Sequence, residues 1–267
     1  MSPEPVKEVS VADGPVASKD AAGVVDFADL LARKTGAKYI YSTGRFLSRP
    51  PAGTELVACQ ELADERIFSG LIDRYALRYS EADRRAVVSM WTTYYFSSLM
   101  IGAAVAWLEL RRVLPLSLDR LNLAADAASG EPRAFVFPDW GHEEEGATIH
   151  EALHGLFRLH AEPLIHAIAA NAGVSRKLIW ANAAGYLSWI VSEVGRLTDP
   201  ALAVEGMVLL DEPCWPDGWK NPLFGMIRRE CGEDGATFGR RRVCCLRYIL
   251  PGVAGCGAVC PLPEGRN

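Results

Sequence analysis

The chain has 267 residues, of which 49% are apolar, and its 28 Lys plus Arg stand against 33 Asp plus Glu, for a formal net charge of -5. This length is enough to bury a sizeable core, and we expect one soluble globular protein. An acidic chain with only 23% charged residues offers no uniformly basic surface to neutralise phosphates, so we expect no nucleic-acid partner.

Residues 1–22 are polar and lack the apolar block of a secretory signal peptide, so we expect a disordered N-terminal arm and a cytoplasmic protein. Thiols stay reduced in the cytosol. The seven cysteines are therefore interpreted as metal ligands or buried thiols rather than as a disulfide framework.

Residues 23–210 form the first structured region and carry mostly helical periodicity. The spacing of apolar residues predicts helices over 24–34, 56–77, 80–112, 117–128, 143–171, 175–197 and 202–210. Short strands are expected at 38–42 and 134–137. Ser80 and Asp83 predict a capping box at the start of the third helix. We therefore expect a mainly α fold with a small β component, arranged as a helical bundle.

One run of the chain, residues 86–108, is uncharged over 23 positions, which is long enough to span a bilayer. It contains several Ser and Thr residues and Gly102, so its hydrophobicity is modest. The run is interpreted as the buried central helix of the bundle. Peripheral association with the inner membrane stays open at this point.

Residues 211–267 differ in composition from the rest of the chain. They hold six of the seven cysteines, many Gly and Pro residues and little helical periodicity. This composition predicts a loop-rich C-terminal segment, packed on the helical part and tied together by something other than a large apolar core. Between Lys220 and Arg247 there are seven basic residues and three acidic ones, so the segment is locally positive.

The first metal-like signal is His150-Glu151-Ala152-Leu153-His154, which matches the zinc-peptidase pattern with Glu151 as general base. His160 falls at the offset of a third ligand, but Phe157 stands where that pattern needs a helix-breaking Gly. In an unbroken helix His160 is about 80° off the face of His150. Polar residues flanking a bundle helix are the favoured interpretation, and a zinc-dependent peptidase is kept as an alternative.

The second signal is a group of four cysteines within 17 residues: Cys244, Cys245, Cys256 and Cys260. Four thiolates with glycines between them are typical of a tetrahedral sulfur site for zinc or an iron–sulfur cluster. Adjacent cysteines are unusual for structural zinc, which favours the cluster, while zinc and disulfides stay open. A zinc-stabilised binding protein without catalysis is therefore a second alternative. Cys59, Cys214 and Cys231 have no ligand-like spacing and are interpreted as buried or incidental thiols.

The segment RRRVCCLRYILP at 240–251, with Cys256 and CPL at 260–262, closely resembles the C-terminal iron–sulfur motif of the FhuF-type ferric siderophore reductases. NPL at 221–223 and WAN at 180–182, ahead of Tyr186 and Trp189, are also similar to that family. The resemblance implies a [2Fe-2S] cluster on the four cysteines named above. The family has two residues between the last two cysteines, whereas this chain has three, Gly257, Ala258 and Val259.

The activity that this resemblance implies is one-electron reduction of siderophore-bound Fe(III) to Fe(II), releasing iron in the cytosol. The implied substrate is a ferric siderophore, of the hydroxamate type. No G-x-G-x-x-G or P-loop pattern occurs, so electrons are expected from an external electron-donor protein or reductant. No acid, base or nucleophile is required, and no catalytic residue is expected beyond the cluster.

The residues expected to bind substrate or tune the cluster are basic or amide-bearing. Arg240, Arg241, Arg242 and Arg247 are next to the cysteines in sequence, and nearby cations favour reduction of an anionic cluster. A solvated arginine run is the other interpretation. Trp180 and Asn182 either line the substrate surface or pack at the start of their helix.

Overall fold

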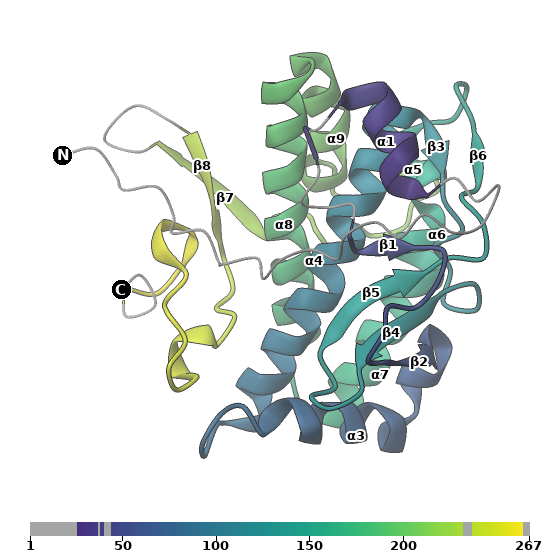
Figure 1. Ribbon diagram of the computed structural model, residues 1–267. Coiled ribbons are helices and arrows are strands. Elements are labelled where there is room, and N and C mark those ends of the chain that lie inside the picture. Colours follow the sequence, from purple (N-terminus) through teal and green to yellow (C-terminus); the bar gives the residue numbers. More distant parts are fainter. Residues whose placement is uncertain (1–25, 37, 40–43, 232–236, 264–267) are drawn as a thin grey trace.

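The computed structural model describes residues 26–36, 38–39, 44–231 and 237–263 (Figure 1). The fold is mainly α with a small β component, as expected. The predicted N-terminal arm at 1–22 lies outside the described residues, and so does most of the strand predicted at 38–42.

The uncharged run forms the centre of the fold as α4 (Arg84–Leu110), a 27-residue helix with buried residues on every side. Helix α4 packs against α8 (Arg176–Leu197), which packs in turn against α9 (Pro200–Asp211). An all-round apolar helix of this kind is stable only when other elements cover it. Across the part of the chain that the structure describes, no helix is long and apolar enough to cross a membrane.

The start of α4 differs from the predicted capping box. Asp83 itself is the N-cap, and its side chain accepts a hydrogen bond from the backbone N–H of Arg85. The box that begins at Ser80 is therefore wrong. At the other end the helix stops at Arg111, which adopts a left-handed backbone with φ of 50°.

A four-stranded sheet of order β1-β5-β4-β2 covers one flank of α4, and its strands are β1 (Phe46–Leu47), β2 (Thr54–Ala58), β4 (Asn122–Asp126) and β5 (Pro132–Val136). Strand β1 pairs parallel with β5, in the register Phe46 to Phe135, and the other pairs are antiparallel. The Phe46 ring lies against Gly102 of α4, where an added Cβ would come within 2.3 Å of the ring. The sheet therefore packs directly on the central helix.

Two expectations fail in this region. The helix predicted over 117–128 is wrong, because residues 122–126 form strand β4 between β5 and β2. The helix predicted over 56–77 is partly wrong, because it begins as β2 and a 3₁₀ turn η1 (Cys59–Ala63) before α3 (Glu65–Ala76). In both stretches short apolar runs fit a helix and a half-buried strand equally well, and pairing within the sheet decides between them.

The helix predicted over 143–171 is also interrupted. It begins at α5 (Ile149–Ala152), breaks at Leu153, continues as α6 (His154–Leu156) and a π turn η2 (Phe157–Ala161), and straightens only in α7 (Glu162–Ala172). The remaining elements of this half are α1 (Phe27–Thr35) and the two-residue strands β3 (Arg112–Val113) and β6 (His142–Glu143).

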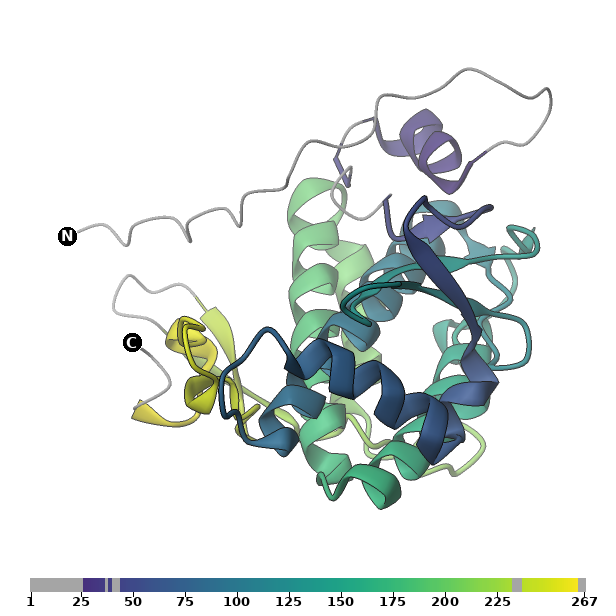
Figure 2. The same ribbon diagram turned by 60° about the horizontal axis from the view of Figure 1, so that its bottom comes forward.

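The C-terminal segment forms a hairpin and two short turns on the flank of α4 and α8 opposite to the sheet (Figures 1 and 2). The hairpin is β7 (Ile227–Cys231) with β8 (Thr237–Arg241), and it lies on α8. The turns are η3 (Arg247–Ile249), which packs on α4, and η4 (Gly257–Val259), which packs on β8. Cys244 and Cys245 lie just before η3, and Cys256 and Cys260 lie on either side of η4.

We predict that Gly195→Ala destabilises the protein by ~1–3 kcal/mol, because the new Cβ would lie 2.5 Å from the Cβ of Ala203 where α8 meets α9. Rotation of a side chain cannot relieve a contact between two Cβ atoms, so the helices must separate. The free energy of unfolding, from urea denaturation, measures the effect.

Gly70→Ala is the matched control, because Gly70 lies inside helix α3 with no atom within 4 Å of its added Cβ. Alanine there should stabilise the protein by ~0.5–1 kcal/mol through helix propensity alone. A stabilising effect at position 195 would show that the two helices are not in close contact.

Candidate functional site

The four clustered cysteines lie on two turns that follow strand β8. Cys244 and Cys245 precede Leu246, whose left-handed backbone (φ 60°) reverses the chain, and the Leu246 N–H donates to Cys244 Sγ at 3.3 Å. Cys256 and Cys260 flank the turn η4, which is closed by a bond from Cys260 N–H to the Gly257 carbonyl. Gly257 has φ of 61°, so the three-residue spacing is accommodated by a tight turn that needs glycine at its first position.

Two of these sulfurs are already close together. Cys245 Sγ and Cys256 Sγ are 3.3 Å apart, somewhat nearer than the ~3.8 Å that separates two thiolates on one tetrahedral metal. Cys245 and Cys260 are buried, and Cys244 and Cys256 are partly exposed. Among the described residues, no three His, Cys, Asp or Glu side chains are placed closely enough to hold a metal ion.

The thiols interact electrostatically as one group. The hydrogen bond from Cys256 lowers the pKa of Cys245 and raises that of Cys256, because the pair stabilises a single shared charge. Burial raises the pKa of Cys244, and the charges of Cys245 and Cys260 raise it further. One negative charge is thus shared by Cys245 and Cys256, and it disfavours ionisation of Cys244.

Arg241 is the cation next to these sulfurs. Its side chain is only 8% exposed, and its Nη1 donates to Asn182 Oδ1 on α8 at 3.0 Å. Its Nε is buried and has no hydrogen-bond partner among the described residues. Burial alone lowers the pKa of Arg241, but the charges of Cys245 and Cys256 outweigh it and the pKa is raised.

A chain of polar groups on the central helices holds Asn182 in place. Its amide Nδ2 donates to Ser89 Oγ at 3.2 Å and to Thr93 Oγ1 at 2.9 Å, both on α4. Ser89 Oγ donates onward to the carbonyl of Cys245 at 2.7 Å. Ser89 and Thr93 were not predicted as part of the site, although hydroxyls at 89, 93 and 97 follow one face of α4 at helical spacing.

The neighbouring arginines have other partners. Arg240 bonds Glu230 through Nε at 2.6 Å and the Cys260 carbonyl through Nη1 at 2.9 Å, so its charge is balanced while it braces the cysteine segment. Arg247 Nε bonds the Ala254 carbonyl at 2.8 Å and closes the loop between the two turns.

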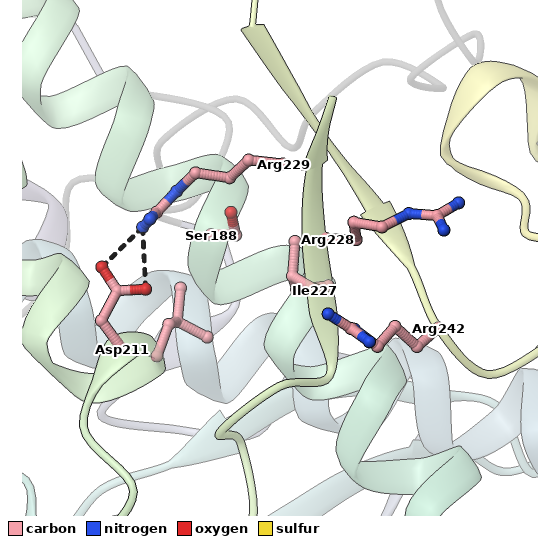
Figure 3. A pocket seen from close by; sticks show the side chains of 7 residues that line it. Ser188, Asp211, Ile227, Arg228, Arg229 and Arg242 are labelled. Carbon is pink, nitrogen blue, oxygen red and sulfur yellow. Dashed lines mark hydrogen bonds and ion pairs between the residues drawn. The ribbon is translucent and has the colours of Figure 1, made fainter. Parts of the chain in front are cut away.

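Arg242 is exposed and faces a small cavity of about 190 Å³ at the base of the hairpin. Figure 3 shows Arg242 on one side of Ile227 and Arg229 on the other, where Arg229 pairs with Asp211 at 2.7 Å. Arg228 also borders the cavity, but its guanidinium pairs with Glu230. Adjacent residues of the arginine run therefore meet different environments, because side chains alternate across a strand.

Trp180 and Asn182 are both interior residues. Trp180 is 5% exposed and stacks on Phe157 at 6.3 Å between ring centroids, so the structure gives it the packing role rather than a surface one. Asn182 is 1% exposed. Asn221, from the second stretch of resemblance, ties the end of α9 to the following loop through the carbonyls of Leu209 and Glu212.

The remaining cysteines lie apart from this group. Cys214 and Cys231 are exposed, whereas Cys59 is buried beside Tyr95. Burial raises the pKa of Cys59 to about 12, so it stays a neutral thiol.

The histidines of the zinc-peptidase pattern point to separate partners. His150 Nε2 lies 3.5 Å from Glu212 Oε2, and its ring packs edge-on against Trp215. His160 is fully buried, with Nε2 2.7 Å from Tyr95 Oη and Nδ1 2.8 Å from the Leu116 carbonyl. The expectation of an unbroken helix through Phe157 is wrong, since a π turn begins there, yet that turn directs His160 into the core and away from His150.

Comparison with known proteins identifies the family of the chain. Residues 89–234 match the family described as ferric iron reductase FhuF-like transporter. The chain belongs to the FhuF family. The matched residues run from α4 to the hairpin and end before Cys244, so the assignment of the four cysteines depends on the motif itself.

Among curated proteins, a ferric siderophore reductase of Escherichia coli strain K12 is 28% identical to this FhuF family member over 182 residues. That match covers 66% of this chain and 65% of the relative. Among solved structures, the aerobactin synthetase IucC of Klebsiella pneumoniae has a TM-score of 0.50 at 14% identity, covering 66% of this chain and 37% of that one. This second likeness concerns the fold alone.

The residues fit a [2Fe-2S] cluster in chemistry and charge. The donor set is four thiols on two adjoining turns, which matches the ligand number and type of such clusters. The buried Nε of Arg241 lacks a partner, and no carboxylate of the described residues forms an ion pair with Arg241. An anionic group at the sulfurs would supply both the acceptor and the countercharge.

We predict that His160 makes stability depend on pH. Burial lowers the pKa of His160 to about 4. Between about pH 6.5 and pH 4 the imidazole is therefore protonated in the unfolded chain but neutral in the folded protein. Stability is then lost as pH falls from about 6.5 to about 4, by about 2 kcal/mol between pH 7 and pH 5. Urea denaturation at the two pH values measures it.

His160→Gln should remove most of that difference, whereas His166→Gln, at an exposed position of α7, should leave it unchanged. An unaltered pH difference in the His160 variant would contradict a neutral core histidine.

Proposed function

We propose that this protein reduces siderophore-bound Fe(III) to Fe(II) by one electron, using a [2Fe-2S] cluster held by Cys244, Cys245, Cys256 and Cys260. The observation that supports the proposal most is a buried arginine without a carboxylate partner beside clustered thiols. Membership of the FhuF family and the curated reductase relative support the substrate class.

The cluster, when bound, supplies a one-electron carrier between an external donor and the ferric chelate. The chain's own part is to hold the ligands, balance their charge and present the site. Siderophores are hard oxygen chelators that favour Fe(III), so adding an electron weakens their hold and lets Fe(II) exchange in the cytosol.

Exposed apolar side chains surround the cysteine turns and suit contact with a chelate or a donor protein. Tyr248 is 41% exposed, Ile249 36% and Val259 40%, and Arg242 adds a positive charge nearby. Cys244 and Cys256 are the partly exposed ligands between them. We propose that a hydroxamate siderophore approaches this surface and that an electron-donor protein uses the same side of the molecule.

Two alternatives use other chemistry. A zinc peptidase would need His150 and His154 to converge with a third ligand, whereas His150 lies against Trp215 and His160 bonds Tyr95. A zinc-stabilised binding protein would use the same four thiols without catalysis. Colour separates the proposals, because a [2Fe-2S] protein is red-brown and a zinc protein is colourless.

We predict that Cys245→Ser abolishes or severely depletes bound iron and sulfide in anaerobically purified protein, because a serine hydroxyl replaces one of four thiolates. Cys244→Ser, Cys256→Ser and Cys260→Ser should behave alike. The visible spectrum with iron and sulfide assays provides the measurement.

Cys231→Ser and Cys214→Ser are matched controls, because both thiols are exposed and lie away from the turns. Both should keep full iron and sulfide content. Full content in the Cys245 variant would refute its role as a ligand, and stoichiometric zinc in the wild-type protein would favour the binding-protein alternative.

We also predict that the dithionite-reduced protein is reoxidised by a ferric hydroxamate siderophore in a single-exponential step. One equivalent of Fe(II) should then appear when a ferrous chelator is present. The gallium complex has nearly the same shape and charge but cannot accept an electron, so it should leave the protein reduced.

A protein that stays reduced in excess ferric siderophore, over times far longer than a turnover of ~0.1 s, would contradict the reductase proposal. That result, with iron and sulfide present, would assign the four thiols a structural role.

A further inference from the structure

The arginine run beside the cysteines contains three cations in different environments. Arg240 is balanced by Glu230 at 2.6 Å, and Arg242 is exposed to solvent. Arg241 alone of the three combines burial with the lack of a carboxylate partner among the described residues. A charge in such a position is poorly screened, so it acts strongly on any neighbouring charge.

A hydrogen bond to Asn182 of α8 fixes the position of the Arg241 guanidinium. Asn182 Oδ1 accepts its Nη1, so the amide oxygen of Asn182 takes one donor of the guanidinium and leaves Nε unpaired. Asn182 cannot rotate freely, because its Nδ2 bonds both Ser89 and Thr93. Reversing the amide would place an N–H against the guanidinium and an oxygen against the two hydroxyls.

The same group of polar residues also contacts the cysteine segment. Ser89 Oγ donates to the Cys245 carbonyl, so one hydroxyl on α4 is bonded to Asn182 and to the backbone of a ligand residue. The Arg241 stem lies against α8 at Gly185, one turn after Asn182, where an added Cβ would be in ordinary contact with its Cδ at 3.5 Å. Helices α4 and α8 therefore set the distance between the guanidinium and the sulfurs.

We infer that Asn182, held by Ser89 and Thr93, is a positioning residue that directs the buried Arg241 guanidinium at the sulfurs of Cys245 and Cys256, and that this single cation sets the reduction potential of the site. The inference rests on the proposed function, since it requires a cluster on the four cysteines. Reduction adds one negative charge, so a buried cation beside the ligands favours the reduced state.

The test is the midpoint potential of the anaerobically purified protein, measured by a dye-mediated titration of its visible spectrum. Arg241→Gln should lower the equilibrium constant for reduction at least tenfold, which is about 59 mV for one electron. Arg242→Gln is the matched control, because it removes the same charge one residue further on from an exposed position. Its effect should be under twofold, because solvent and salt screen an exposed charge.

Two further variants separate positioning from the mere presence of charge. Arg241→Lys keeps the positive charge but lacks the planar guanidinium. Its midpoint potential should therefore lie between those of the Arg241→Gln variant and the wild-type protein. Asn182→Ala keeps Arg241 and removes the group that orients it, so it should lower the potential by less than Arg241→Gln. It should also make the potential more sensitive to added salt than in the wild-type protein.

The outcomes distinguish failure of this inference from failure of the proposed function. Equal potentials in the Arg241→Gln and Arg242→Gln proteins, with iron, sulfide and siderophore-driven reoxidation intact, would overturn the inference and leave the reductase proposal standing. If Arg241→Gln fails to retain iron, an unchanged potential in both Arg241→Lys and Asn182→Ala would overturn it instead. A wild-type protein without iron and sulfide would overturn both proposals.

Discussion

A buried guanidinium is tolerated only beside negative charge, and this constraint organises the C-terminal part of the protein. Arg241 is nine-tenths buried, and the groups that stabilise its charge are the thiols of Cys245 and Cys256. Removing one partner of a buried pair is costly because the other charge stays in a poorly solvating interior. The hairpin that carries Arg241 and the turns that carry the cysteines are therefore energetically linked, and the packing of β8 on α8 places that link over the central helices.

The central helix α4 has an apolar side that faces the sheet and a polar side that faces the cysteine segment. Towards the sheet, α4 offers Gly102 to the ring of Phe46 and buries apolar groups. Towards the cysteine segment it offers Ser89 and Thr93. The Ser89 hydroxyl donates to the carbonyl of Cys245, and the Thr93 hydroxyl donates to the carbonyl of Ser89 within the helix. Buried polar groups are acceptable only when they are paired, and here the pairing runs through Asn182 to Arg241. The Ser and Thr content that keeps this helix from resembling a membrane span thus has a structural purpose.

The sequence was informative where period or chemistry was distinctive. Helix α8 and strand β5 were predicted nearly to their ends, because long periodic runs and β-branched or aromatic clusters are strong signals. Strand β4 was mistaken for a helix, because the alanine-rich run after Leu123 has high helix propensity and only pairing with β5 and β2 overrides it. The chain reversal after Cys244 and Cys245 was not predicted, because the left-handed Leu246 that produces it carries no sequence signature. Arg240 and Arg241 are both buried, and which of them lacks a carboxylate partner among the described residues was likewise invisible, since it depends on the register of β7 with β8.

Register also explains why one position in the arginine run differs from the next. Ile227 pairs with Arg241 and Arg228 with Arg240, so alternate residues of β8 face α8 and the side of Cys260. A slip of one residue would place Arg240 or Arg242 against Asn182 and turn Arg241 outward. The bond from Arg242 N–H to the Met226 carbonyl continues the ladder beyond the hairpin and opposes such a slip. The charge next to the sulfurs is therefore determined by two separate features, the pairing of β8 with β7 and the Asn182 amide on α8 that accepts the guanidinium. Both must be correct for one guanidinium to meet the thiols.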